Sequence, residues 1–363
     1  MDKLTSKKAL LDSIRTKEGI NFECDENAIL EEYNTQEDNK SSLAIKLLSV
    51  FGGFLAALAF LDFLAIAGLY DSKFGLSIFG IVFIISAIWL NKAYDKLIID
   101  TFSISIYVIG FVLLASGLSL MNVDENMIAI LISLIAFSSL LITQNFMLSF
   151  ISILTINSSF IFLITSNYSY DFIHLYTAIN TLLLTYVLLN EAKIISLNKR
   201  LSQLYNPMRI GLVISLLFGL ISIGKKDLMP LSQNLIWLSS MVMALVTLYL
   251  INTIIKINEI NTVKSKVIIY TLSLLILAST TFSPSIAGAI VLVLLSFLVN
   301  YKTGLAIGII ALIYFISQYY YDLNFTLLTK SIILFVSGIT FLLFYLFTTK
   351  LFTTKNLNNN EKI

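Results

Sequence analysis

Twelve long runs of mostly apolar residues, separated by short polar connections, fill the chain from residue 47 to residue 347. A bilayer's hydrocarbon core is about 30 Å thick, and a helix needs about 20 apolar residues to cross it. Because lipid offers no hydrogen bonds to the backbone, such segments must be helical. The runs predict an all-α polytopic membrane protein with about twelve transmembrane helices and short loops. The expected spans are residues 47–69, 74–90, 101–121, 127–143, 146–165, 172–189, 210–223, 235–255, 267–282, 286–299, 304–321 and 327–347.

Composition agrees with this class. The chain is 57% hydrophobic and 13% charged, whereas about 25% of residues are charged in an ordinary soluble domain. The net charge of +2 gives no support for nucleic-acid binding. With one cysteine and one histidine, the chain has too few soft ligands for a Cys/His zinc site. We expect no cofactor, and an enzymatic role is the less favoured alternative.

Positive charges give the orientation. If the loops alternate sides, 20 of the 24 Lys and Arg residues fall on the side of the N-terminus, and four fall on the other side: Lys73, Lys225, Lys226 and Lys330. Lys and Arg accumulate in cytoplasmic loops. We therefore expect both termini of this multi-pass protein to lie in the cytoplasm.

The chain divides into three parts by composition. Residues 1–42 are polar and predict a cytoplasmic arm of amphipathic helices, residues 43–349 form the transmembrane domain, and residues 350–363 predict a disordered tail. Three prolines, Pro207, Pro230 and Pro284, are expected in connections between spans. The segment 267–299, interrupted at Pro284, forms either two short spans or a re-entrant hairpin.

Three ionisable residues inside the expected spans are candidates for function, because a charge in lipid is costly. Asp62 is the deepest, about 15 residues into the first span, or about 22 Å at the helical rise of 1.5 Å per residue. His174 and Lys330 lie within three residues of the outer ends of their spans and can reach the interface. Asp62 and Lys330 would form an ion pair if the first and last helices were neighbours. The alternative for Lys330 and His174 is an ordinary interfacial role.

Aromatic and small polar residues add weaker signals. Tyr319, Tyr320 and Tyr321, followed by Asp322, fit an aromatic belt at the outer interface, with Tyr321 and Asp322 as further candidates. Gly304, Gly308 and Ala311 form a small-residue face suited to close helix packing. Asn157 and Asn180 are mid-span amides that we expect to bond across helices, with pore lining as the alternative.

The C-terminal third resembles a family of uncharacterised bacterial multi-pass membrane proteins. The resemblance is carried by the segment from Ser283-Pro284-Ser285 to Gly288, by Gly304 and Gly308, and by Tyr319-Tyr320-Tyr321-Asp322-Leu323 followed by Thr326-Leu327-Leu328-Thr329-Lys330-Ser331. It implies an inner-membrane protein whose relatives are encoded beside a membrane-anchored protein with a Gly-Asp-Tyr…Leu…Pro motif. That family has no established catalytic or binding residue.

These observations favour a membrane component of a small complex, partnered by a membrane-anchored protein or by a second copy of the chain. The alternative is a secondary transporter or exporter of a small solute that uses Asp62. An intramembrane enzyme would have to depend on His174 as its general base.

Overall fold

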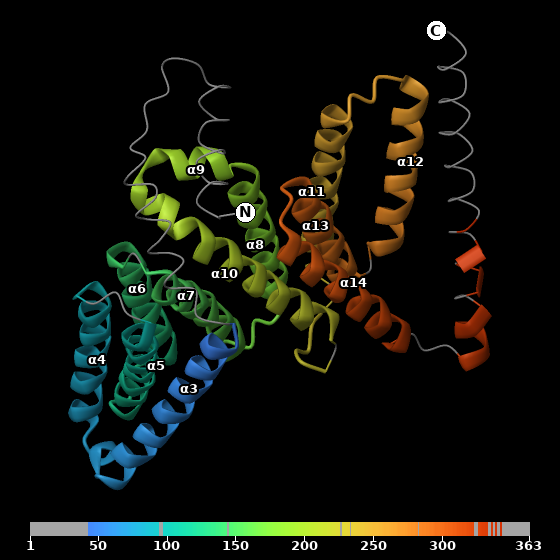
Figure 1. Cartoon of the computed structure of the whole chain (residues 1–363). Helices are drawn as coiled ribbons and strands as arrows, with labels where there is room; N and C mark the ends of the chain where they lie inside the picture. The colour runs from blue at the N-terminus through green and yellow to red at the C-terminus, as the bar shows by residue number, and fades with distance from the viewer. Residues whose placement is uncertain are drawn as a thin grey trace, which may run out of the picture. The chain divides into compact units, whose positions relative to one another are not determined.

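The computed structural model describes residues 43–93, 97–143, 145–225, 227–232, 234–281, 283–322, 326–332, 335–336, 338–339 and 342, and every regular element in these ranges is a helix (Figure 1). This confirms the all-α class. The helices are α3 (Leu43–Ile66), η1 (Leu69–Asp71), α4 (Lys73–Ala93), α5 (Leu97–Leu120), α6 (Glu125–Ile142), α7 (Phe146–Ser166), α8 (Phe172–Leu189), α9 (Glu191–Leu197), α10 (Lys199–Gly224), α11 (Ile236–Ile257), α12 (Val263–Thr280), α13 (Pro284–Leu298) and α14 (Lys302–Asp322).

Each of the first eleven expected spans coincides with one of these helices. Among the described residues, nine helices are long and apolar enough to cross a membrane, and α13 is a shorter apolar helix. The total of twelve spans and the cytoplasmic location of both termini therefore stay predictions. The expected arm (1–42), the expected tail (350–363) and about half of the last span (327–347) lie outside the described residues.

The expectation that Pro207 lies in a connection is wrong. α10 begins at Lys199, where Asn198 caps it by accepting a hydrogen bond from the Leu201 amide at 2.8 Å, and it continues through Pro207 to Gly224. Proline lacks an amide hydrogen, so it removes one helical bond, that to the carbonyl of Gln203. Packing offsets this loss, because Tyr205 and Pro207 are both buried. Helices in proteins owe most of their stability to such packing rather than to intrinsic propensity.

The chain divides into two compact units, Met1–Val112 and Leu113–Ile363. In the first unit, α4 and α5 approach closely at two glycines: a Cβ atom on Gly110 would lie 2.9 Å from the carbonyl oxygen of Gly80. At the other end of this helix pair, the Asn91 side-chain amide donates to Asp100 at 2.7 Å. Small residues and a polar link of this kind are typical of helix packing in membranes.

The second unit is organised around α10, which packs against α7, α8, α9, α13 and α14 (Figure 1). α11 packs against α8 and α13, and α12 lies beside α11. The core of this unit is aliphatic, and Leu216, Leu220, Leu250 and Leu292 are fully buried in it. α10 is thus the element on which the helices before and after it are assembled.

The small-residue face of α14 packs on α13. A Cβ atom on Gly308 would lie 3.1 Å from the backbone nitrogen of Val293, and one on Gly304 would lie 2.6 Å from Ser296 Oγ. Ala311 is buried on the same face. α13 has 15 residues, or about 22 Å of helix, and most of its side chains are buried. Whether the segment 267–299 crosses the membrane twice stays open.

Candidate functional site

Asp62 lies near the end of its helix. α3 ends at Ile66 rather than at Leu69, so Asp62 is four residues, or about 6 Å, from the helix terminus. Its side chain is exposed, on a helix whose sequence is otherwise almost entirely apolar. Asp62 belongs to the first unit and Lys330 to the second, and their pairing stays a prediction.

Lys330 closes the end of α14. The residue is 8% exposed, and its ammonium group donates a 3.1 Å hydrogen bond to the backbone carbonyl of Tyr321. It also lies 5.3 Å from the centre of the Tyr320 ring. A cation stabilises the partial negative charge at the C-terminus of a helix. Asp322 accepts a bond from Gln318 at 3.1 Å. The Tyr-Tyr…Lys pattern therefore has a structural role as a helix cap, while the ring of Tyr321 remains exposed.

His174 joins α8 to α11. It is 1% exposed, and its Nδ1 lies 2.8 Å from Ser239 Oγ. One turn earlier, Asp171 accepts bonds from the backbone amide and the hydroxyl of Ser232, in the connection that precedes α11. His174 and Asp171 thus attach the start of α8 to α11 and to the connection that precedes α11. Of the other candidate residues, Lys330 and Tyr321 contact each other.

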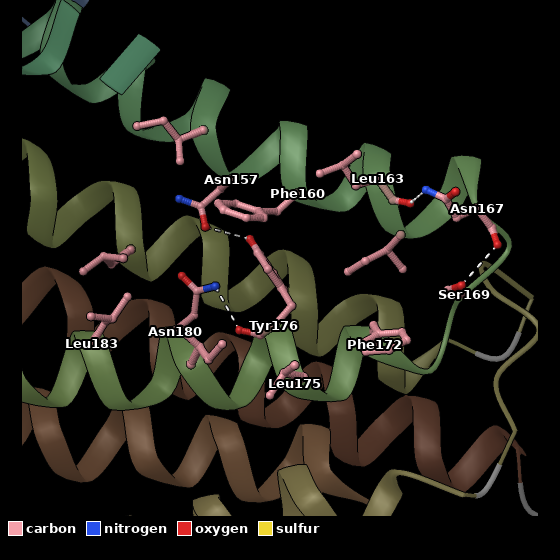
Figure 2. A pocket seen from close by; sticks show the side chains of 14 residues that line it. Asn157, Phe160, Leu163, Asn167, Ser169, Phe172, Leu175, Tyr176, Asn180 and Leu183 are labelled. Atoms are coloured by element: carbon pink, nitrogen blue, oxygen red, sulfur yellow. Dashed lines mark hydrogen bonds between the residues drawn. The ribbon is translucent and has the colours of Figure 1, made fainter. Parts of the chain in front are cut away.

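A groove lies between α7 and α8 (Figure 2). Both helices pack on α10 but touch each other little, and the space between them has a volume of about 630 Å³. Its walls are mainly apolar, and Leu212 of α10 also lines it. From Phe172 to Leu183 the groove follows twelve residues of α8, a length of about 16 Å. The residues that line it are Ile156, Asn157, Phe160, Leu163, Ile164, Asn167, Ser169, Phe172, Leu175, Tyr176, Ile179, Asn180, Leu183 and Leu212.

A short polar network lies on the groove wall halfway along the two helices. The Tyr176 hydroxyl donates to Asn157 Oδ1 at 3.1 Å and also lies 3.4 Å from the carbonyl of Ser215 in α10. Asn157 Nδ2 donates to the carbonyl of Ile153 at 2.9 Å. Asn180 Nδ2 donates to the carbonyl of Tyr176 at 3.0 Å, as the dashed line in Figure 2 shows. These bonds span α7, α8 and α10 and fix the positions of the side chains.

Asn180 Oδ1 is the exception in this network. It is buried and has no hydrogen-bond partner among the described residues, and the residue is 3% exposed. Figure 2 shows this oxygen on the side of α8 that faces α7. A buried carbonyl without a partner costs about 1–3 kcal/mol, and because this oxygen has almost no accessible surface, it lies behind the groove wall and is not open to the groove.

The two asparagines were expected to bond across helices, and they behave differently. Asn157 does so through Tyr176, whereas the amide nitrogen of Asn180 bonds within its own helix. Tyr176 was missed at the sequence level. It is the residue four positions before Asn180, on the same helical face, so the i, i+4 spacing of a tyrosine and a mid-span asparagine was the available signal.

The comparisons with known proteins give a family but no relative of established activity. No curated protein and no solved structure matches the chain. A family model described as a domain of unknown function, DUF4401, matches residues 42–351, a range that includes all the helices named above. The expected membership of an uncharacterised family is confirmed, and this protein belongs to the DUF4401 family.

Proposed function

We propose that this integral membrane protein binds a small lipophilic molecule in the groove between α7 and α8. The observation that carries the proposal is the groove itself, a cleft of about 630 Å³ that is lined by apolar side chains and a few positioned polar groups. Ligand sites in proteins have volumes of about 300–1,000 Å³ and this type of lining. A helix that crosses the membrane is about 10 Å wide and 30 Å long. The groove is too small for such a helix, so a small molecule fits it better than the membrane helix of a partner protein.

The walls of the groove indicate how a ligand would reach it. Phe160, Leu175, Ile179 and Leu183 line the groove and are each between 39% and 50% exposed. In a bilayer, apolar side chains that are open in this way face the acyl chains. A lipophilic molecule would therefore enter sideways from the membrane, without passing through water.

Photolabelling tests this function. A small aryl diazirine that partitions into the bilayer should label α7 and α8 peptides in the purified, full-length protein in nanodiscs. Ile179→Trp places a larger side chain in the groove and should abolish this labelling. Leu182→Trp is the matched control, because Leu182 is 51% exposed on the same helix and does not line the groove. Labelling that is equal in the two variants would refute the proposal.

A second candidate function, membership of a small membrane complex, is supported by Asp62. An exposed carboxylate on an apolar membrane helix is costly unless a partner or water covers it. The neighbour suggested by the family resemblance, a membrane-anchored protein, and a second copy of this chain are the candidate partners. Transport through Asp62 is a further alternative that the same residue supports, and Asp62→Asn in uptake and efflux assays addresses it.

Mild-detergent purification tests the complex. The wild-type protein should co-purify with a membrane partner of defined size, and Asp62→Leu should lose it. Asp71→Leu is the control, because Asp71 is also exposed but lies in η1, outside α3. A protein that is recovered alone at every detergent concentration would contradict complex membership and leave the groove proposal unaffected.

A further inference from the structure

We infer that α9 and the first residues of α10 bind the headgroup of an anionic phospholipid. The residues that form this surface, called the α9 surface below, are Lys193, Ile195, Leu197, Lys199 and Arg200. None of them is among the residues that line the groove, so the inference goes beyond the proposed function and does not depend on it. The position of α9, its exposed side chains and its charge support the inference.

The first feature is the position of α9 at the level where α8 leaves the apolar part of the membrane. α8 contains no Lys, Arg, Asp or Glu, and α9 follows it after one residue. Figure 1 shows α9 lying across the ends of α8 and α10. Arg209 is the last charged residue of α10, and its guanidinium lies 4.2 Å from the centre of the Tyr301 ring and 5.3 Å from that of Tyr205. Tyrosine and arginine of this kind mark the membrane interface. We therefore place α9 at the interface.

The second feature is the set of apolar side chains that α9 leaves exposed. Successive residues of a helix are about 100° apart, so Ile195 and Leu197 lie on either side of the buried Ile194. They are 37% and 64% exposed, respectively. Lys193 and Leu197 are four residues apart and share one face of the helix. A lipid joins a charged headgroup to an apolar chain, so it can contact both side chains, whereas a soluble anion offers nothing to the leucine.

The third feature is the charge of the α9 surface. Lys193, Lys199 and Arg200 are all exposed, and no carboxylate lies between the first and the last of them in the sequence. Within the part of the chain that the structure describes, none of the three forms an ion pair. The one carboxylate of α9, Glu191, acts electrostatically on the hydroxyl of Tyr205. Basic residues at the interface attract anionic lipids, so the charge of the α9 surface is complementary to such a headgroup.

A tryptophan on α9 can test the inference, because brominated lipids quench the fluorescence of a tryptophan that they contact. Leu197→Trp is made in the full-length protein, with Trp89→Phe and Trp237→Phe to remove the native signal. The protein is placed in phosphatidylcholine nanodiscs with increasing mole fractions of brominated phosphatidylglycerol or brominated phosphatidylcholine. Ile257→Trp is the matched reporter: Ile257 is 65% exposed and ends α11, next to Lys256.

The α9 reporter should distinguish the two brominated lipids. One cation near an anionic headgroup contributes about 1 kcal/mol, which is about fivefold in binding. Brominated phosphatidylglycerol should therefore reach half-maximal quenching at a mole fraction about fivefold lower than brominated phosphatidylcholine. The difference should be smaller at the α11 reporter, where Glu259 offsets the charge of Lys256. This comparison of two lipids does not depend on how a charge variant folds.

Charge variants then assign the preference to the α9 surface. The triple variant Lys193→Gln, Lys199→Gln and Arg200→Gln should abolish the preference at the α9 reporter and leave the α11 reporter unchanged. All three side chains are exposed, so the variant should fold as the wild type does. Glycerol phosphate, the soluble part of the same headgroup, should not reduce the quenching, because it has no chain for the apolar side chains.

Four other outcomes would each overturn the inference. An equal preference at the two reporters would show a general attraction of anionic lipids to the basic side of the protein. Equal quenching by the two lipids at the α9 reporter would show that no headgroup is selected there. Quenching by neither lipid would show that α9 lies outside the lipid. Competition by glycerol phosphate would show a site for soluble anions. None of these results changes the photolabelling of the groove, so the two proposals fail separately.

Discussion

At Gly219, α10 closely approaches α8 beside Tyr176, a residue of the groove wall. A methyl group on Gly219 would lie 2.6 Å from Thr177 Oγ1 and 3.3 Å from the ring of Tyr176. Thr177 is fully buried, and its hydroxyl donates to the carbonyl of Ile173 at 2.7 Å. The side chain therefore cannot rotate away without breaking a buried bond, and Gly219→Ala must move α8.

The cost of Gly219→Ala follows from these distances. The new methyl group and Thr177 Oγ1 must separate by 0.8 Å to reach an ordinary contact of 3.4 Å. Overpacking of this kind costs about 1–3 kcal/mol, and replacing a helical glycine by alanine returns roughly 0.5–1 kcal/mol. We expect the free energy of unfolding in mixed micelles to fall by roughly 1–2 kcal/mol. Labelling of the groove should fall too, because Tyr176 moves with α8.

Two further variants make this prediction refutable. Gly52→Ala, whose new methyl group has no described atom within 4 Å, should leave the stability unchanged or slightly raise it. Thr177→Ala removes the clashing hydroxyl, so the double variant with Gly219→Ala should recover most of the lost stability, and the coupling energy can be read from a double-mutant cycle. A Gly219→Ala protein as stable as wild type, or no recovery in the double variant, would refute this account of the α8–α10 contact.

Three other predictions concern the ends of the helices and the orientation of the chain. Lys330→Met should lower stability by about 1 kcal/mol and speed amide hydrogen exchange in the last turn of α14, because the Tyr321 carbonyl loses its donor; unchanged exchange would contradict the capping role. Asp171→Ala removes two bonds to Ser232 and should speed proteolysis of the α10–α11 connection, whereas unchanged cleavage would show that these bonds do not hold it. Reporter fusions at the two termini should both indicate the cytoplasm, and opposite locations would refute the charge-based orientation.

The helices were predictable because their signal is local. A run of about 20 apolar residues is costly anywhere but in lipid or a protein core, so eleven helices lie where the runs do. Pro207 was misplaced because a proline in a sequence favours a break, whereas the packing that tolerates it involves residues distant in sequence. The role of Lys330 could not be predicted either, because its partner is a backbone carbonyl nine residues away. Every residue has such a carbonyl, so the sequence does not show which one the lysine bonds.

The groove could not be predicted at all. α7 and α8 are consecutive and antiparallel, and a short connection usually implies direct packing. They separate because each packs on α10 instead. The packing of α7 and α8 on α10 depends on the close contacts of Gly211 with Ile153 and of Gly219 with Thr177. The periodicity of apolar residues in the sequence does not predict these contacts. The asparagines were recognisable as mid-span amides, but the missing partner of Asn180 is a property of three helices together.

The central position of α10 has a consequence for the order of assembly. All groove residues belong to one continuous stretch, from Ile156 to Leu212, in α7, α8, α10 and the connection between α7 and α8. Chains enter the membrane from the N-terminus onwards during synthesis. The helices that form the groove can therefore enter the membrane while α11 to α14 are still being made, and the contact of His174 in α8 with Ser239 in α11 forms only afterwards.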